Sequence, residues 1–423
     1  MTLPGSNGIV VMKFGGTSVA DAEHLIGAAR RMVRARDDGR AVVAVLSARG
    51  ATTDQLVEMA QEISREPHPR EMDMLLSTGE RISCALCAMA LNDLGAEAIS
   101  LSGSQAGIVT DTSHTKARIL DVRADRIRAG LEDGKIVLVA GFQGVSTSRD
   151  VTTLGRGGSD TTAVALAAAL GADVCEIYTD VDGVFSADPR IVPDARKLPL
   201  LSFEEMLEMS ASGAKVLQLR SVEYARNYGV RIHVRPSFGD GSGTLVLGEE
   251  ETMERPLITA VTHSTEDARV TLTGVPDRPG VAARIFGTLA EADVNVDMIV
   301  QNEPVSPDHM AEISFTVPKS DLSTARRSLE GLSAELGLAA VIADEEMGKV
   351  SVVGAGMRSH PGVAARVFQT LGEREINIEM ISTSPIKISC VIAADRVSDA
   401  VRSLHEAFEL GKDEIQREDG GPR

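Results

Sequence analysis

The chain has 423 residues, of which 43% are hydrophobic and 25% charged, and its formal net charge is −18. This length exceeds one ordinary hydrophobic core and predicts two or three domains. The negative charge opposes the attraction that drives nucleic-acid binding, so we expect no nucleic-acid partner. No uninterrupted apolar run reaches 18 residues and no charged leader precedes an apolar segment, so we expect no membrane partner and a cytoplasmic location.

Residues 8 to about 235 alternate between strand-like and helical patterns. The strand-like runs are IVVMKF, AVVAVLS, KIVLVAGF and VCEIYT. Between the first two, near-3.6 spacing predicts one helix with an apolar face at Val19, Leu25, Ile26, Ala29, Met32 and Val33. The alternation predicts an α/β domain with a mainly parallel sheet covered on both faces.

Cys84 and Cys87 form a C-x-x-C pair in the stretch RISCALCAMAL. The pair lacks a second, metal-spaced pair, so packing inside a buried helix is favoured over metal binding.

The second half of the chain contains an internal repeat. PGVAARIFGTLAEADVNVDMI (279–299) returns as PGVAARVFQTLGEREINIEMI (361–381), 82 residues later. Each copy predicts a strand, a Pro-Gly turn, a helix and a second strand, with Val281, Ile285 and Leu289 on the apolar face of the first helix. We therefore expect a domain at 1–250, a linker at 251–264 and two modules at 265–346 and 347–423 that are able to exchange strands.

The opening stretch VMKFGGTS places two glycines after a strand. Gly15 and Gly16 lack a Cβ and let backbone N–H groups approach an anion, while Lys13 supplies a positive charge and a helical pattern begins at once. A plain strand-to-helix turn would use the same glycines. The phosphate-binding pattern G-x-x-x-x-G-K-[ST] is absent from the sequence.

Two later loops combine charges with turns. VTTLGRGGSDTTA sets Arg156 among glycines before a helix capped by Ser159 or Asp160, and an Arg suits a carboxylate. In EIYTDVDGVFSADPR, Thr179, Asp180 and Asp182 follow a strand, where ligands bind in open α/β sheets, and Asp188 and Arg190 follow in a loop. A Gly-rich connection and a solvated acidic loop are the competing interpretations.

Further polar residues complete a candidate site. Ser47 and Thr53 lie in the loop after the second strand, and Glu80 lies in a helical pattern. Together the cations, glycine turns and carboxylates indicate a site for a nucleotide and an amino acid. Phosphoryl transfer needs mainly positioning and charge neutralisation. A carboxylate acceptor needs no general base because it is ionised at pH 7.

The motifs KFGGTS, VLSARGATTD, STGERIS, GRGGSDTTA, TDVDGVFSADPR and GAKVL, in this order, closely resemble those of the aspartate kinases of the amino-acid kinase superfamily. The repeated modules resemble the paired ACT domains of those enzymes. The resemblance implies an αβα sandwich followed by two ferredoxin-like βαββαβ ACT modules. It also implies transfer of a phosphoryl group from ATP, with Mg²⁺, to the β-carboxylate of L-aspartate. The product would be 4-phospho-L-aspartate, on the route to lysine, threonine and methionine.

The resemblance also implies roles for individual residues. Lys13, with Gly15 and Gly16, would hold the transferring phosphoryl group. Ser47, Thr53 and Glu80 would face aspartate, with Glu80 on its ammonium, and Arg156 would clamp the α-carboxylate with Asp160 close by. The nucleotide side would be lined by Thr179, Asp180, Asp182, Asp188, Arg190 and Lys215.

The ACT resemblance implies that an amino acid, lysine or threonine, regulates the enzyme. In the first copy the candidate effector contacts are Asp277, Pro279, Gly280, Asn295, Asp297 and Gln301. In the second copy they are Met357, Ser359, His360, Gly362, Asn377, Glu379 and Ser382. ACT pairing implies a homo-oligomer, and a separate regulatory chain starting near Met253 is an alternative.

Two other functions stay open at this point. One is a kinase for another acidic substrate, such as glutamate or N-acetylglutamate. The other is an amino-acid sensor without catalytic activity, in which the kinase domain is only a scaffold.

Overall fold

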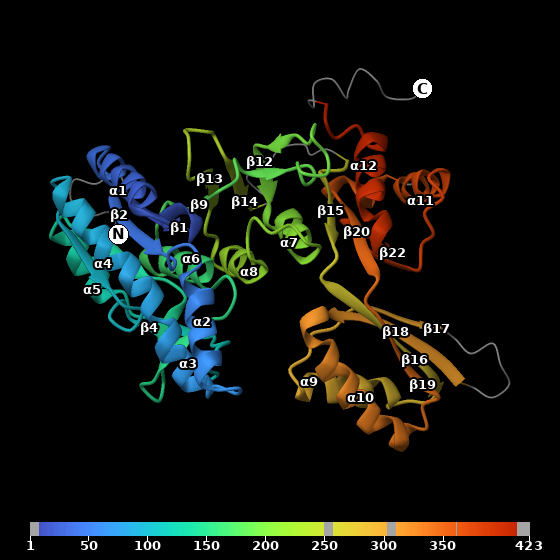
Figure 1. Cartoon of the computed structure of the whole chain (residues 1–423). Coiled ribbons are helices and arrows are strands. Elements are labelled where there is room, and N and C mark those ends of the chain that lie inside the picture. The colour runs from blue at the N-terminus through green and yellow to red at the C-terminus, as the bar shows by residue number, and fades with distance from the viewer. Residues whose placement is uncertain (1–7, 249–256, 303–309, 361, 413–423) are drawn as a thin grey trace. The chain divides into compact units, whose positions relative to one another are not determined.

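The computed structural model describes residues 8–248, 257–302, 310–360 and 362–412 (Figure 1). The chain forms two compact units. Unit 1 comprises Met1–Val184, Lys197–Ser210 and Lys215–Glu254. Unit 2 comprises Phe185–Arg196, Ala211–Ala214 and Arg255–Arg423. The boundary between domains was expected near residue 250, but two short segments that precede it in the sequence, Phe185–Arg196 and Ala211–Ala214, belong to unit 2. Met253 lies outside the described residues.

Unit 1 is built on an eight-stranded sheet in the order β12-β14-β13-β9-β1-β2-β6-β3. Of the strand pairs described in this sheet, only β13 and β14 run antiparallel, which confirms the expected mainly parallel sheet. The strands are β1 (Ile9–Phe14), β2 (Ala41–Leu46), β3 (Ala98–Leu101), β6 (Ile136–Ala140), β9 (Val174–Thr179), β12 (Leu200–Ser202), β13 (Ile232–Pro236) and β14 (Thr244–Leu247).

Two smaller sheets accompany the main one. Four strands lie in the order β5-β4-β7-β8, and two form the pair β10-β11. Their bounds are β4 (Ile108–Thr110), β5 (Ile119–Val122), β7 (Gln143–Ser146), β8 (Val151–Thr153), β10 (Val184–Phe185) and β11 (Lys197–Leu198).

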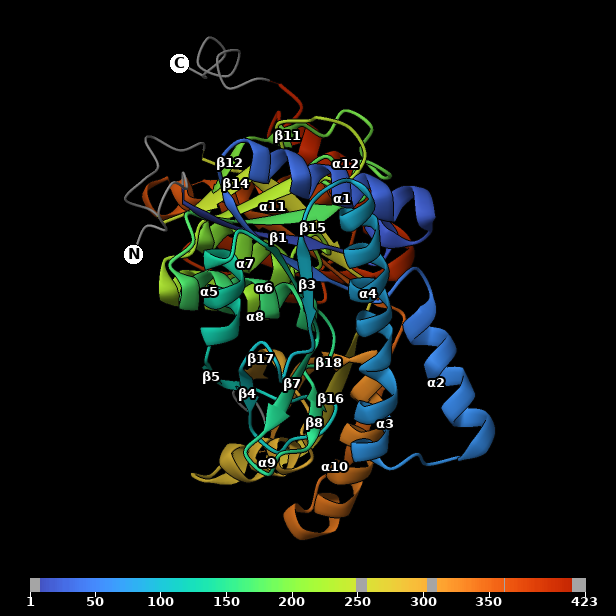
Figure 2. The ribbon, with the colours of Figure 1, turned by 90° about the vertical axis from the view of Figure 1, so that its left-hand side faces the viewer.

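Helices cover both faces of the main sheet, as Figure 2 shows. On β1, the side chains of Val10, Met12 and Phe14 pack in one core with α1 (Ala22–Asp37) and α4 (Thr78–Asp93). Side chains alternate between the faces of a strand, so Lys13 points to the opposite face. There it meets α6 (Gly158–Leu170), which packs against α8 (Leu219–Tyr228). The remaining helices are α2 (Thr52–Ile63), α3 (Pro69–Leu76), α5 (Asp125–Glu132) and α7 (Phe203–Ala211).

The first helix differs from its sequence prediction. A 3₁₀ turn, η1 (Thr17–Val19), follows the glycines, and α1 begins only at Ala22 with Asp21 as its N-cap. The Asp21 side chain accepts a hydrogen bond from the His24 N–H at 3.0 Å. Ile26, expected on the apolar face, is 36% exposed, and Ala28 is buried in its place. The buried residues Leu25, Ala28, Ala29 and Met32 follow the i, i+3, i+4, i+7 spacing of one helix face, and Ile26 lies beside that face.

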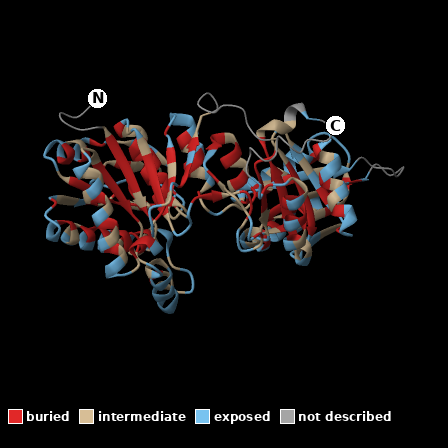
Figure 3. Cartoon of the chain, turned by 90° about the horizontal axis from the view of Figure 1, so that it is seen from above, coloured by how far each residue is buried: buried red, intermediate tan, exposed pale blue. Residues whose placement is uncertain are grey.

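Helices α3 and α4 join end to end through Ser77. By length and composition alone, the stretch Pro69–Asp93 could cross a membrane, and 44% of its most apolar window is buried within the protein. Core helices meet the same criterion, and Cys84 and Cys87 pack in the core between α1 and the sheet, as expected for a buried helix. Figure 3 shows the buried strands between helices whose outer sides are exposed.

In unit 2 the first module has the chain order βαββαβ and the sheet order β17-β18-β16-β19. This is a ferredoxin-like module, as expected. Its elements are β16 (Asp267–Pro276), α9 (Val281–Glu291), β17 (Asp297–Asn302), β18 (Met310–Pro318), η3 (Lys319–Asp321), α10 (Leu322–Leu336) and β19 (Ala340–Asp344). Val281, Ile285 and Leu289 are buried as predicted.

The second module takes its fourth strand from elsewhere in the chain. Its sheet order is β15-β20-β22-β21, in which β15 (Ala260–Ser264) fills the place that β19 has in the first module. The expected linker at 251–264 thus contributes a strand. The other elements are β20 (Met347–Val353), η4 (Ala355–Ser359), α11 (Val363–Glu373), β21 (Met380–Ser384), β22 (Lys387–Ala393), η5 (Ala394–Arg396) and α12 (Val397–Ala407).

Candidate functional site

A cavity of about 280 Å³ opens at the carboxyl ends of β1 and β2. Of the residues predicted from the sequence, it is lined by Lys13, Gly15, Gly16, Ser47, Thr53, Glu80, Arg156 and Asp160. The fold therefore brings together four motifs that lie up to about 150 residues apart in the sequence. This edge of an open parallel sheet is where such folds bind ligands.

Lys13 lines the cavity from β1, the strand between β2 and β9. Its Nζ is 2.5 Å from Asp160 Oδ1, and the two side chains are only 12% and 9% exposed. Asp160 belongs to the first turn of α6, so its carboxylate faces Lys13 instead of capping the helix. The expectation of a Ser159 or Asp160 cap was wrong because α6 begins at Gly158, and its N-cap is Gly157.

The glycine turn after β1 is held close to the loop after β2. A Cβ on Gly16 would lie 2.9 Å from the carbonyl oxygen of Ala48, which is too close for a side chain. The Gly50 N–H donates to the Gly16 carbonyl at 3.0 Å. The Gly15 N–H donates to the Tyr178 carbonyl at 3.4 Å, so this amide, predicted to face a phosphate, already has a long hydrogen bond.

Glu80 reaches the cavity from α4 and is 3% exposed. Its Oε1 accepts a hydrogen bond from the Ala48 N–H at 3.1 Å, and its Oε2 has no hydrogen-bond partner among the described residues. Burial raises the pKa of this carboxyl to about 7, although the hydrogen bonds to its ionised form act in the opposite direction. A cationic ligand group would satisfy the free oxygen and keep the carboxyl ionised.

Arg156 is exposed and lies between two glycines in the left-handed region, Gly155 at φ 76° and Gly157 at φ 71°. At Gly157 a side chain would also overlap Gln218. The two glycines allow a tight loop just before α6, and the backbone of this loop lines the cavity.

Sequence reasoning missed Phe142 as part of the cavity. Phe142 lies two residues after the end of β6 and has a positive φ of 66°, which is rare outside glycine. Its N–H donates to Thr162 Oγ1 at 3.2 Å. The run KIVLVAGF already indicated a strand end at this position, and a strand end in a parallel sheet is the signal that could have found it.

The predicted nucleotide-side residues do not gather in this cavity. Thr179 ends β9, and its Oγ1 donates to Asp180 Oδ1 at 3.1 Å, while Asp180 and Asp182 are exposed. Asp188 and Arg190 pair with each other at 2.7 Å and belong to unit 2. The Arg190 guanidinium holds the Asp188 pKa below its usual value. Lys215 is exposed between α7 and α8.

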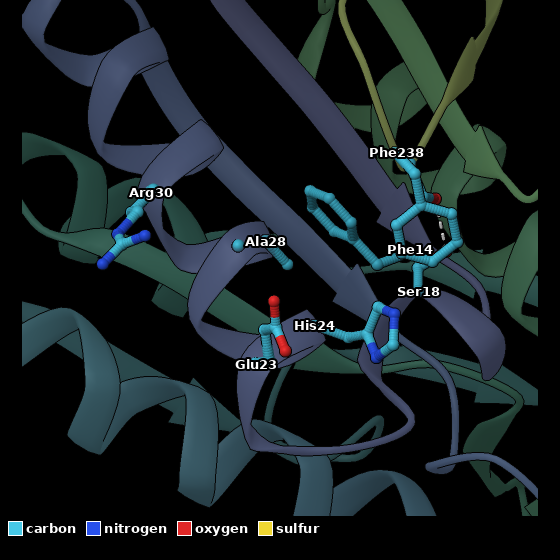
Figure 4. Close-up of a pocket in the computed structure, with 9 residues that line it drawn as sticks. Phe14, Ser18, Glu23, His24, Ala28, Arg30 and Phe238 are labelled. Carbon is cyan, nitrogen blue, oxygen red and sulfur yellow. Dashed lines mark hydrogen bonds between the residues drawn. The ribbon is translucent and has the colours of Figure 1, made fainter.

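A second cavity of about 250 Å³ lies between α1 and the segment after β13 (Figure 4). The hydroxyl oxygens of Ser18 and Ser237 form a hydrogen bond of 2.5 Å. The rings of His24 and Phe238 pack edge to face, with their centroids 4.7 Å apart. Of the opening glycine motif, Phe14 and Ser18 line it. This cavity is on the α1 side of β1, opposite to the face that carries Lys13.

The candidate effector residues lie in two places in each module. Asp277, Pro279, Gly280, His360 and Gly362 are exposed at the turns before α9 and α11, with Met357 partly buried beside them. Ser359 ends η4, and its side chain lies outside the described part of the chain. The other candidates lie at or before the β17 and β21 strands, namely Asn295, Asp297, Gln301, Asn377, Glu379 and Ser382.

Two of these strand residues form ion pairs across the modules. Asp297 pairs with Lys349 at 3.0 Å, and Glu379 pairs with Arg269 at 2.7 Å. Burial raises the pKa of Asp297, but attraction and a hydrogen bond from Lys349 outweigh it, so the pKa falls below its ordinary value. Between the ion pairs, Met298, Met347, Met380 and Val391 form a small apolar core.

Comparison with known proteins identifies the class. The model of the amino acid kinase family matches residues 8–236, and the ACT domain model matches 270–331 and 350–408. The chain belongs to the amino acid kinase family.

Within this family the similarity is to one group of enzymes. Aspartokinase of Mycolicibacterium smegmatis is 56% identical over 409 residues, 96% of this chain and 97% of the relative. Aspartokinase of Corynebacterium glutamicum is 53% identical over 406 residues, 95% of this chain and 96% of the relative. The chain is accordingly a kinase of the aspartokinase group, with paired ACT domains for regulation.

A solved structure agrees with this assignment. The crystal structure of E. coli aspartokinase III with aspartate and ADP matches with a TM-score of 0.80 at 26% identity, covering 94% of this chain and 99% of that one. The same enzyme in complex with lysine and aspartate matches with a TM-score of 0.72 at 27% identity, covering 95% and 99%.

Proposed function

We propose that the enzyme transfers the γ-phosphoryl group of ATP to the β-carboxylate of L-aspartate in the cavity that holds Lys13. The observation that carries this proposal is the pairing of two opposite binding groups at one cavity, the buried Glu80 carboxyl and the Arg156 guanidinium. A carboxylate suits an ammonium, and an Arg fork suits a carboxylate. Together they match the α-ammonium and α-carboxylate groups that form the head of an α-amino acid.

Lys13 is suited to the reaction itself. In the absence of substrate its charge is balanced by Asp160, and a phosphoryl group in the cavity would compete for the same ammonium. A positioned cation stabilises the charge on a transferring phosphoryl group. The acceptor carboxylate attacks the phosphorus in its ionised form, so the cavity needs no general base. Ser47 and Thr53 also line the cavity and supply hydroxyl groups for the substrate.

The nucleotide would extend from this cavity toward the end of β9, where Thr179, Asp180 and Asp182 lie. Among the described residues no group of three or more His, Cys, Asp or Glu side chains forms a metal cage. This fits Mg²⁺ in a kinase, which is held largely by phosphates and water with one or two carboxylates. Mg²⁺ would neutralise phosphate charge, and the exposed Asp180 and Asp182 are the candidates to hold it.

Regulation by lysine is proposed at the ACT modules. The aspartokinase III structure with lysine supports an amino-acid effector for this architecture. In this chain, Asp297 and Glu379 are carboxylates engaged by cations of the other module. An effector ammonium would compete for these carboxylates, and its binding would then change how the modules meet.

The test is ATP-dependent acyl phosphate formation trapped with hydroxylamine. We expect turnover with L-aspartate and none with L-glutamate or N-acetylglutamate, and inhibition when lysine or threonine is added singly or together. Turnover with glutamate instead would assign another substrate. Binding of aspartate or lysine by calorimetry without turnover would favour a sensor without catalytic activity.

A further inference from the structure

Glu80 and Arg156 reach the cavity by separate routes through the fold. Glu80 lies on α4, which continues α3 through Ser77. Arg156 lies in the loop that follows β8. We propose that Asp73, buried on α3, positions the Arg156 loop relative to Glu80 and thereby sets the affinity for the α-amino acid head of the substrate. This inference rests on the proposed function.

Asp73 is fully buried and uses both carboxylate oxygens. Oδ1 accepts from Thr153 Oγ1 at 2.5 Å and from the Thr115 N–H at 3.0 Å. Oδ2 accepts from the Thr115 N–H at 3.2 Å and lies 2.6 Å from His114 Nδ1. A carboxylate has about four acceptor sites, so this one is saturated by donors from two other segments. A buried charge satisfied in this way holds its neighbours in one arrangement.

The contacts lead from Asp73 to Arg156 in short steps. Thr153 is the last residue of β8, three positions before Arg156, and its carbonyl accepts the Ala117 N–H at 2.9 Å. A Cβ on Gly155 would lie 3.1 Å from the Thr115 carbonyl oxygen, so the loop rests directly on that segment. The segment 114–117 is therefore clamped between α3 and the base of the Arg156 loop.

A cation, Arg220, holds the other side of this clamp. Arg220 on α8 donates to the Leu154 carbonyl at 3.1 Å and to the Ala117 carbonyl at 2.9 Å. It thus ties the residue after Thr153 to the same segment that Asp73 holds. The loop base is fixed from both sides, and Arg156 itself is exposed.

Thr115 carries backbone strain at this point. Its φ is 67°, in the left-handed region that a β-branched residue rarely adopts. Strained backbone persists where the surroundings determine it, and such positions cluster at functional sites. At Thr115, the hydrogen bonds from its N–H to both Asp73 oxygens hold the backbone in this conformation.

The experiment compares Thr153→Val with Thr153→Ser in the full-length protein. Valine has the shape of threonine without the hydroxyl, so it removes one donor to Asp73. We expect the KM for aspartate to rise about tenfold while the KM for ATP stays within about twofold, because a small displacement of Arg156 affects only the amino acid head. Serine keeps the hydroxyl and should restore the wild-type KM. Equal rises in both KM values, or no rise, would overturn the proposal.

A double-mutant cycle with Arg156→Ala separates positioning from general damage. If Thr153 acts only through Arg156, Thr153→Val should have no further effect on the KM for aspartate in the Arg156→Ala background. Additive effects would show that Thr153 acts by another route and would contradict the inference. Asp73→Asn is the second variant, for use if Thr153→Val does not fold. It places an amide N–H group where the carboxylate accepts hydrogen bonds. It should likewise raise the KM for aspartate and leave the KM for ATP within about twofold of the wild-type value.

Asp150→Asn is the matched control. Asp150 lies in the turn of the same hairpin and accepts from Arg70 of the same helix at 2.8 Å. Both side chains are partly exposed, and exposed ion pairs contribute little. The KM of Asp150→Asn for aspartate should match that of the wild type. Wild-type turnover with aspartate is measured in parallel. Its absence would refute the proposed function, whereas a wild-type-like Thr153→Val in an active enzyme would refute only the role of Asp73.

Discussion

At the scale of single residues, Glu80 has the most unusual environment in the cavity. Its carboxyl titrates near pH 7 because burial opposes its charge. A protonated Glu80 cannot attract an ammonium, so kcat/KM for aspartate should fall as the pH is lowered through about 7. The measurement is a pH profile of initial rates for the wild type and Glu80→Gln. Loss of this limb in the variant, at a much higher KM, supports the assignment, and an unchanged profile contradicts it.

The same shift predicts an effect on stability. A carboxyl whose pKa is raised on folding binds its proton more tightly in the folded state than in the unfolded chain. Ionised Glu80 therefore destabilises the protein above about pH 7, and this penalty is removed as the pH falls toward the ordinary value of 4.5. Glu80→Gln should therefore melt at or above the wild-type temperature at pH 8, in thermal unfolding followed by circular dichroism.

Two cationic side chains, those of Lys13 and Arg156, line the cavity. Lys13→Ala and Arg156→Ala should each lower turnover at least about a hundredfold, the scale of losing one transition-state contact. Lys135→Ala is the control, because Lys135 is a surface residue paired with Asp133 at 2.9 Å. Acyl phosphate formation by purified, folded variants is the measurement. A wild-type rate in either cavity variant would remove that residue from the site.

At the scale of elements, the turn after β1 depends on contact between two loops. Gly16→Ala would place a Cβ 2.9 Å from the Ala48 carbonyl oxygen and must move one loop away from the other. We expect a fall in kcat of at least about tenfold, because the displaced loops carry the cavity-lining residues Gly15 and Ser47 and the Ala48 N–H that binds Glu80. The measurement is steady-state kinetics with both substrates.

Gly27→Ala is the matched control for this substitution. Gly27 lies within α1 and has no atom within 4 Å of its would-be Cβ. Alanine in a helix is more stable than glycine by about 0.5 to 1 kcal/mol, so the control should raise the unfolding free energy and keep its activity. An active Gly16→Ala enzyme would show that the close contact is not needed.

At the scale of the whole molecule, the second unit contains a buried cation that joins its two modules. Lys349 is 3% exposed and pairs with Asp267 at 3.4 Å and with Asp297 at 3.0 Å. Lys349→Met leaves these carboxylates without their cation and should destabilise the contact by about 1 to 3 kcal/mol, reduced from the fully buried case because Asp297 is half exposed. Faster amide hydrogen exchange in β17 and β20 would report this loss.

The surface pair of Arg326 and Glu330 supplies the control for this prediction. Both side chains are more than half exposed, so Arg326→Met should leave exchange in β17 and β20 unchanged. Unaltered exchange in Lys349→Met as well would show that the apolar methionine cluster alone holds the modules together. Because the pKa of Asp297 is lowered, the ion pair stabilises the unit above about pH 4 and is lost as the pH falls through the lowered pKa.

Much of this molecule followed from the sequence because its patterns are local. Continuous apolar runs between helical patterns predicted the strands IVVMKF, AVVAVLS, KIVLVAGF and VCEIYT, and all four are parallel neighbours in the sheet. The repeat predicted two similar modules, since a duplicated sequence encodes a duplicated fold. Glycines beside charges indicated where anionic groups would be held.

Tertiary structure decided what no local pattern records. It placed β15 in the sheet of the second module, because a sheet edge accepts any strand of suitable register that the chain brings near. It turned Asp160 to Lys13, and it assigned Asp188 and Arg190 to the second unit. It also buried Asp73 under the Arg156 loop, among donors from residues 41 to 80 positions away. These contacts form by packing of distant segments, whose energies depend on the whole fold and not on neighbours in the chain.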